Sequence, residues 1–245
     1  MEKLYIVIPA YNEEENIDRV VREWHDVVAK INEQSRIVVI DDGSKDNTYA
    51  KLKELQKKLP QLEAITKPNS GHGATVLYGY HYALENAADY VFQTDSDGQT
   101  VTEEFWQFWN DRNNFSVIIG YRNYRQDGVS RIFVTKVLKI LLWCIFHICI
   151  TDANTPFRLM KKDVLRKYIS HIPSDFNLAN VLLTVYFVKF CKKVKFISIS
   201  FKPRAGGVNS INFIKIVKIG KKAISDFISS RKYMNKNAEE LLYHG

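Results

Sequence analysis

Two aspartates separated by one residue, Asp95 and Asp97, are the side chains of this 245-residue chain best suited to chemistry. They follow the strand-like run at 90–94 and precede Gly98 and Gln99. Carboxylates spaced in this way suit Mg²⁺ or Mn²⁺, which take one or two carboxylates together with substrate phosphate oxygens. The same pair is also typical of two solvated turn aspartates, so the surrounding elements must decide between these interpretations.

A second acidic pair, Asp41 and Asp42, follows the apolar run at 37–40. The residues after it have the composition of a turn and a helix cap, which explains Ser44 and Asp46 without any ligand. A turn and a cap do not explain two adjacent aspartates at the end of a buried strand. A carboxylate in that position can accept a hydrogen bond from a nucleobase N–H or a ribose hydroxyl.

The elements that must position these residues alternate along the first 120 residues. Near-continuous apolar runs, typical of parallel strands covered on both faces, lie at 4–8, 37–40, 88–92 and 117–119. Helical patterns lie between them, at 13–31, 46–58 and 71–86. The alternation predicts a doubly wound, mostly parallel α/β sheet with helices on both faces. Because ligands bind at the carboxyl ends of parallel strands, we expect three polar clusters on one rim: Pro9–Glu13, Asp41–Ser44 and Asp95–Gln99.

The second half of the chain is less regular. Its patterns predict helices at 131–150, 161–170 and 177–191, a strand at 195–201, and a basic helix from about 211 to 231. Gly206 and Gly207 interrupt the chain before this last helix. We therefore predict one α/β domain over residues 1–210, with a basic amphipathic helix and tail, residues 211–245, packed on or beside it.

The net charge of +8 favours an anionic partner, such as nucleic acid, an acidic membrane surface or a phosphorylated small molecule. No nucleic-acid-binding motif accompanies the charge, so we expect no nucleic acid partner. The three cysteines lack metal-ligand spacing and indicate reduced thiols in the cytoplasm. We expect neither a signal peptide nor a membrane span, because the apolar run at 140–150 is far shorter than the ~20 residues that a spanning helix needs.

Other nucleotide-binding classes fit the sequence less well. Gly71-His72-Gly73 opens a helix, but it lacks the third glycine of a dinucleotide fingerprint and does not follow the first strand. His72 is therefore interpreted as a rim or structural residue. A sugar-nucleotide pyrophosphorylase should carry a Gly-rich, basic loop after the first strand, where this chain has Ala10-Tyr11-Asn12-Glu13. A non-catalytic binding subunit would be expected to lose the metal carboxylates, and both are present.

Four motifs, in this order and spacing, resemble family-2 glycosyltransferases with the GT-A fold: Pro9-Ala10-Tyr11-Asn12-Glu13, Val39-Ile40-Asp41-Asp42-Gly43-Ser44, Asn69-Ser70-Gly71 and Asp95-Ser96-Asp97-Gly98-Gln99. The branch that the chain resembles most is that of the polyprenyl-phosphate glycosyltransferases, which includes dolichyl-phosphate mannose synthase. The run Asp152–Met160 and the turn Arg204–Gly207 are similar to later motifs of that branch. The resemblance covers about residues 4–210.

The resemblance implies a role for each matching residue. The donor nucleotide-sugar would contact Pro9, Tyr11, Glu13, Asp41, Asp42, Asp95, Ser96, Asp97 and Arg204. The metal, Mg²⁺ or Mn²⁺, would be held by Asp95, Asp97 and Gln99, and Arg131 would meet the phosphate of the acceptor. The reaction would invert the anomeric centre in one displacement. This chain departs from the branch in two ways: no lysine follows Gly207 closely, and we expect none of the C-terminal membrane spans that many relatives carry.

The acceptor half of the reaction is open to two interpretations. A sugar hydroxyl needs a positioned general base, for which Asp152 is the candidate, whereas a polyprenyl phosphate is already anionic and needs cations. Arg122, Arg125 and Arg131 can supply those cations. The helix at 131–150 is basic at its start and apolar later; this suits either a core helix or a helix lying on an anionic membrane.

We therefore predict a metal-dependent, inverting glycosyltransferase that moves a sugar from a UDP- or GDP-sugar to a polyprenyl phosphate. The enzyme would act as a peripheral protein at the cytoplasmic face of the cell membrane. The alternative is transfer to a saccharide hydroxyl in surface polysaccharide synthesis, with Asp152 as the base. The identities of the sugar, the base and the acceptor stay open, as do a homo-oligomer and a membrane-protein partner.

Overall fold

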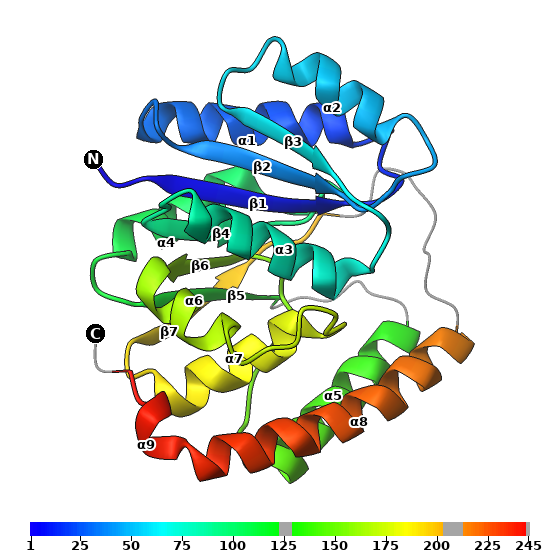
Figure 1. Ribbon diagram of the computed structural model, residues 1–245, viewed down its shortest axis with the longest axis vertical. Helices are drawn as coiled ribbons and strands as arrows, with labels where there is room; N and C mark the ends of the chain where they lie inside the picture. The colour runs from blue at the N-terminus through cyan, green and yellow to red at the C-terminus, as the bar shows by residue number, and fades with distance from the viewer. Residues whose placement is uncertain (123–128, 203–212, 244–245) are drawn as a thin grey trace.

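The computed structural model describes residues 1–122, 129–202 and 213–243, with only the backbone described at 129–134 and 213–221. Its centre is a sheet in which the described strands lie in the order β3-β2-β1-β4-β6-β5-β7 (Figure 1). The strands are β1 (Leu4–Ala10), β2 (Arg36–Asp41), β3 (Leu62–Thr66), β4 (Tyr90–Gln93), β5 (Val117–Arg122), β6 (Arg158–Lys161) and β7 (Val194–Ile199). All paired neighbours are parallel except those of β6, which runs antiparallel to both β4 and β5. The prediction of a mostly parallel α/β sheet is confirmed.

Helices cover both faces of the sheet and close two apolar cores (Figure 1). One face carries α1 (Ile17–Ile31), α2 (Thr48–Gln56) and α4 (Phe105–Asp111). The other carries α3 (His72–Glu85), α6 (Lys162–Ile169) and α7 (Ala179–Phe190). In α1 the buried residues recur at helical spacing, so one stripe of the helix packs on the sheet.

Helices α5 (Val129–Phe146) and α8 (Phe213–Lys236) lie side by side at one end of the molecule (Figure 1). Phe146 and Phe227 join them, with ring centroids 5.7 Å apart. Phe227 and Met234 are buried in the same core as α3 and α7. The short helix α9 (Ala238–Leu241) follows α8. The proposed boundary at residues 210–211 remains a prediction.

The sequence patterns missed some short elements. Strand β3 is only partly buried and has no continuous apolar run, and β6 has two apolar residues between Arg158 and Lys161. Helix α4 was also missed. Over the residues that the structure describes, no helix is both long enough and apolar enough to span a bilayer.

Candidate active site

The predicted rim exists at the carboxyl ends of β1, β2 and β4. Strand β1 pairs with both β2 and β4, so the three strand ends are neighbours. Ser96 Oγ donates a hydrogen bond of 2.8 Å to the carbonyl of Pro9, and the Asp42 N–H donates one of 2.8 Å to the carbonyl of Ala10. The structure therefore brings the three predicted polar clusters together. Ser96 is buried, and its hydroxyl serves to hold two strand ends in place.

The Asp95 carboxylate lies buried among the charged residues of this rim. Its Oδ1 is buried and has no hydrogen-bond partner in the part of the chain that the structure describes. Burial, together with the charges of Asp97 and Glu13, raises the pKa of Asp95 to about 6, although His72 and Arg122 act in the opposite direction. An orphaned carboxylate oxygen beside two other acids is the environment that a cation would stabilise.

The residues at this position fit a divalent cation that takes part of its ligands from the substrate. Asp95 and Asp97 would hold Mg²⁺ or Mn²⁺, which usually keep substrate phosphate oxygens in their shell. Among the described residues no group of three or more His, Cys, Asp or Glu forms a complete metal cage. The shell would therefore be completed by the substrate or by water.

Gln99, which was predicted as a further metal contact, ties the acidic turn to the segment that follows β7. Its Nε2 donates to the carbonyl of Lys202 at 2.9 Å, and the Lys202 N–H donates to the carbonyl of Gln99 at 2.7 Å. The Gln99 N–H also donates to Asp97 Oδ1 at 3.1 Å. The metal-binding role of Gln99 stays a prediction; in the structure its backbone N–H orients the Asp97 carboxylate.

The Asp42 carboxylate organises the loop that leads into α3. Its oxygens accept hydrogen bonds from Lys67 Nζ, from the Ser70 N–H at 2.9 Å and from the Gly71 N–H at 2.9 Å. Burial raises the pKa of Asp42, but the bonds from Lys67 and Ser70 outweigh it and leave the pKa below its usual value. Gly71 has φ +89°, a conformation that favours glycine. Lys67 is a cation on this rim that the sequence reasoning missed.

Asp41 lies deeper than its neighbour. Its Oδ2 accepts a hydrogen bond of 2.7 Å from the Thr66 hydroxyl, and its Oδ1 accepts one of 3.3 Å from the Ser44 N–H. Its side chain is buried and joins β2 to β3. This position fits a supporting role, and donor contact by Asp41 remains a prediction.

The loop after β1 is joined to the loop after β2 by reciprocal hydrogen bonds. The Asn12 N–H donates to Ser44 Oγ at 2.9 Å, and the Lys45 N–H donates to Asn12 Oδ1 at 2.8 Å. The Glu13 N–H donates to Thr48 Oγ1 at 2.8 Å, which leaves the Glu13 side chain buried near Asp95. Tyr11, in the same loop, exposes 38% of its surface and presents a ring at the rim.

The predicted base Asp152 is paired with a cation. Arg122, the last residue of β5, donates from Nε to Asp152 Oδ2 at 3.0 Å. The Arg122 guanidinium also lies 4.9 Å from the centroid of the Phe201 ring. Arg122 acts electrostatically on Asp95, so this pair belongs to the same site as the acidic rim. Arg131 lies on the first turn of α5 at a position without a described side chain, and Arg125 and Arg204 lie outside the described residues.

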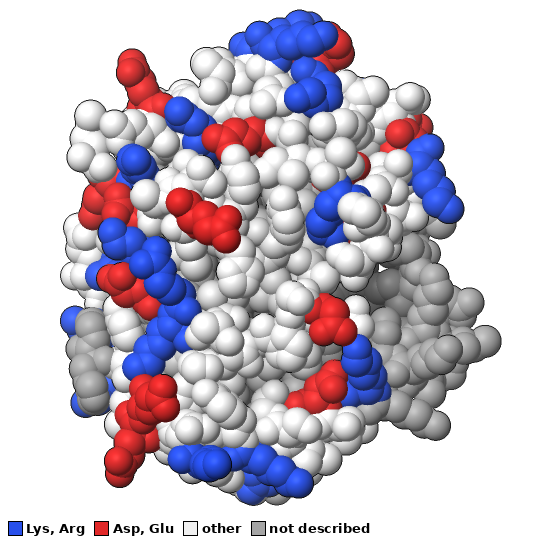
Figure 2. Space-filling model, in the orientation of Figure 1, with Lys and Arg blue, Asp and Glu red and all other residues white. Residues whose placement is uncertain are grey.

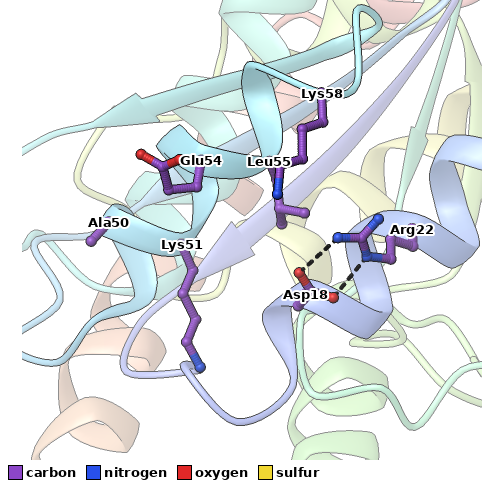
Figure 3. A pocket seen from close by; sticks show the side chains of 7 residues that line it. All are labelled: Asp18, Arg22, Ala50, Lys51, Glu54, Leu55 and Lys58. Carbon is purple, nitrogen blue, oxygen red and sulfur yellow. Dashed lines mark hydrogen bonds and ion pairs between the residues drawn. The ribbon is translucent and has the colours of Figure 1, made fainter.

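Two surface cavities of the described part of the molecule contain neither Asp95 nor Asp97. Figure 3 shows the first, of about 360 Å³, between α1 and α2, where Arg22 is paired with Asp18 at 2.8 Å. The second, of about 460 Å³, runs along α3 from Lys67 to Glu85. On the face seen in Figure 2, basic and acidic side chains are interspersed, so the net charge is not concentrated there.

Comparison with known proteins supports a sugar-transfer site. The family model described as "Glycosyl transferase family 2" matches residues 5–169. The chain is 27% identical over 185 residues to UDP-N-acetylglucosamine–dolichyl-phosphate N-acetylglucosaminyltransferase of Methanococcus voltae, covering 66% of this chain and 71% of that protein. It is 25% identical over 163 residues to undecaprenyl-phosphate 4-deoxy-4-formamido-L-arabinose transferase of Pseudomonas fluorescens, covering 65% of this chain and 47% of that protein.

Solved structures share the fold. Glucosyl-3-phosphoglycerate synthase of Mycobacterium tuberculosis, in complex with Mn²⁺, uridine diphosphate and phosphoglyceric acid, aligns with a TM-score of 0.68 at 14% identity. The alignment covers 94% of this chain and 78% of that one. The likeness shows that the two chains share a fold.

Proposed function

The chain belongs to glycosyl transferase family 2, and from that premise we propose that it transfers a sugar from a UDP- or GDP-sugar to a polyprenyl phosphate. The observation that carries the proposal is the acidic rim around Asp95 facing the Arg122–Asp152 pair. The curated relatives named above act on dolichyl or undecaprenyl phosphate. The chain spans 71% of one and about half of the other, so the acceptor is assigned here as part of the proposal.

The donor half of the site is formed by β1, β2 and β4. Tyr11, Glu13 and the Asp42–Lys67 pair would hold the base and ribose, with Pro9 lining the same edge. Asp95 and Asp97 would hold Mg²⁺ or Mn²⁺, which supplies positive charge for the departing diphosphate. In our proposal, Arg204 contributes further positive charge to the donor phosphates.

The acceptor half is formed by the chain around β5 and β6. A phosphate oxygen attacks the anomeric carbon, the bond from that carbon to the diphosphate breaks, and UDP or GDP leaves with inversion. The attacking oxygen is already anionic, so it needs placement by a cation more than removal of a proton. Arg122 is suitably placed beside the site, and Arg131 is its proposed partner. Asp152, held by Arg122, orients that cation and is less suited to act as a free base.

A lipid acceptor requires access to a membrane, and α5 offers an apolar surface for it. Val137, Ile140 and Trp143 expose 38%, 62% and 58% of their surfaces at three-residue spacing on this helix. Lys136 and Lys139 are exposed on the same helix. We assign the enzyme a peripheral position on the anionic cytoplasmic face, with this surface of α5 in the headgroup region.

The experiment that tests the function is a donor screen by nucleotide release. Several UDP- and GDP-sugars are supplied with Mn²⁺, with and without a short polyprenyl phosphate, to the wild type and to Asp95→Asn. We expect one donor to be consumed in a manner that depends on the lipid phosphate and on Asp95. Turnover of no donor by the wild type, together with no binding of any, would refute the proposal.

A further inference from the structure

The first residue of β6, Arg158, is an arginine with no exposed surface. Its guanidinium donates from Nε to the carbonyl of Thr155 at 3.0 Å and from Nη1 to the carbonyl of Asn180 at 3.1 Å. It also donates from Nη1 to Thr184 Oγ1 at 3.3 Å, and from Nη2 to the carbonyls of Ala153 at 3.4 Å and Thr155 at 2.5 Å. Every hydrogen bond that the structure describes for this cation therefore ends on a neutral oxygen.

These bonds connect the turn that carries Asp152 to the start of α7. Ala153 and Thr155 belong to that turn, whereas Asn180 and Thr184 lie in the first two turns of α7. Thr184 Oγ1 adds a second link, a hydrogen bond of 2.9 Å to the carbonyl of Ala153. The turn is thus fixed to a buried helix by a rigid, planar group with five donors.

Arg158 also lies close in the sheet to the strand that leads into the acidic rim. It pairs in register with Gln93, the last residue of β4, and Asp95 follows two residues later. Burial lowers the pKa of Arg158, and the neighbouring Tyr80, Asp152 and Asp95 raise it. The cation is therefore placed within electrostatic range of acids from both halves of the site.

Several buried polar atoms of this cluster lack a partner in the described part of the molecule. They are Gln93 Nε2, Asn180 Nδ2 and Thr155 Oγ1. Replacing a buried ionic group by an apolar side chain of similar volume is often neutral or stabilising, so packing alone does not require a cation here. Unsatisfied buried groups concentrate where geometry serves a function.

We propose that Arg158 is a positioning residue of the transfer reaction: it fixes the turn at residues 152–155 and thereby the Asp152–Arg122 pair. This inference rests on the proposed function, because Arg122 is the cation that meets the acceptor phosphate. Arg158 itself is buried beneath the site and touches neither substrate. Its loss should displace Arg122 while leaving the donor half, built on β1, β2 and β4, in place.

Kinetics of Arg158→Lys, Arg158→Met and Thr184→Val test the inference. We expect Arg158→Met to lose on the order of 10²-fold in kcat/KM for the lipid phosphate, as small displacements of reacting groups do, with UDP affinity unchanged. Arg158→Lys and Thr184→Val should show smaller losses of the same kind. Tyr168→Phe is the matched control, because it removes a buried hydroxyl whose hydrogen bond of 3.0 Å goes to the Leu241 carbonyl, away from the site.

A double substitution and hydrogen exchange complete the test. If Arg158 acts through Arg122, then Arg158→Lys added to Arg122→Lys should cause little further loss. In Arg158→Lys, amides at residues 152–158 and the start of α7 should exchange faster, with β1 to β3 unchanged. Hydrogen exchange does not depend on turnover, so it tests the inference even if the wild type turns over no donor. Failure of the proposed function and failure of this inference can therefore be told apart. Equal loss of UDP affinity and turnover, or uniformly faster exchange, would overturn the inference.

Discussion

At the scale of single residues, replacing Asp152, the partner of Arg122, distinguishes a phosphate acceptor from a hydroxyl acceptor. If the acceptor is a phosphate, Asp152→Asn keeps the cation and loses less than about tenfold in kcat, whereas loss of a general base costs ~10²–10⁴-fold. The measurement is the initial rate with polyprenyl phosphate at saturating donor. Asp163→Asn, on the exposed side of α6, is the matched control. A loss of three orders of magnitude, about that of a missing base, would contradict the account in which Asp152 only orients Arg122.

The Asp95 carboxylate gives the donor site a dependence on pH. Its pKa is raised to about 6 in the absence of ligands, so it holds a proton below that pH and is ionised above it. A divalent cation binds the ionised form, and affinity for UDP with Mn²⁺ should therefore fall as the pH drops through 6 and level off above it. Titration calorimetry across this range measures the effect, and Asp95→Asn should remove it. Affinity that does not vary with pH would contradict the assignment of Asp95 as a metal ligand.

At the scale of elements, the exposed face of α5 determines membrane binding. Replacing both Ile140 and Trp143 by serine should weaken binding to anionic liposomes on the order of 10²-fold, because each buried apolar side chain of this size contributes ~1.5–3 kcal/mol. Sedimentation with vesicles at low and high salt provides the measurement. Tyr78→Ser, an exposed aromatic on α3, is the control. Unchanged sedimentation of the α5 variant would show that this face does not contact the lipid.

The regular elements were predictable because their residues carry a local pattern. The buried runs of β1 and β2 and the stripe of α1 depend on neighbours in the sequence. Strand β6 could not be found in that way, because two apolar residues between Arg158 and Lys161 have no period and form a strand only by pairing with β4 and β5. The placement of Asp95 and Asp97 on a shared rim followed from the rule for parallel strands.

Pairs between distant residues were the part of the site that the sequence did not predict. Lys67 bonds Asp42 across 25 residues, and Arg122 bonds Asp152 across 30. Nothing in the local composition marks either pair, since each depends on which loops the sheet order brings together. For Arg131 and Arg204, the predicted roles fall on side chains outside the described part of the chain.

At the scale of the whole molecule, we expect the ionised, buried Asp95 carboxylate to lower the free energy of unfolding until ligands bind. Folding raises the pKa of Asp95 from 3.8 to about 6. Its protonated form therefore contributes stability that is fully present below the pKa of the unfolded chain and is lost as the pH rises through 6. At neutral pH, Asp95→Asn should therefore raise the melting temperature of the ligand-free protein. Mn²⁺ with UDP at ~100 times Kd should stabilise the wild type by about 2.7 kcal/mol and the variant much less. Differential scanning fluorimetry compares the four states. A variant that melts earlier, or that retains the full shift, would contradict this account.

The reversed direction of β6 has a consequence for how such enzymes diversify. The chain leaves the sheet at Arg122, the end of β5, and re-enters at Arg158, the start of β6, with Ile119 and Arg158 paired in register. Because the two junctions are neighbours in the sheet, the segment between them can be exchanged without altering strand order, provided that its contacts with α7 and α8 are kept. Residues 123–157 could thus be grafted between relatives to change the molecule that receives the sugar. The nucleotide-sugar would continue to be selected by an unaltered half of the protein.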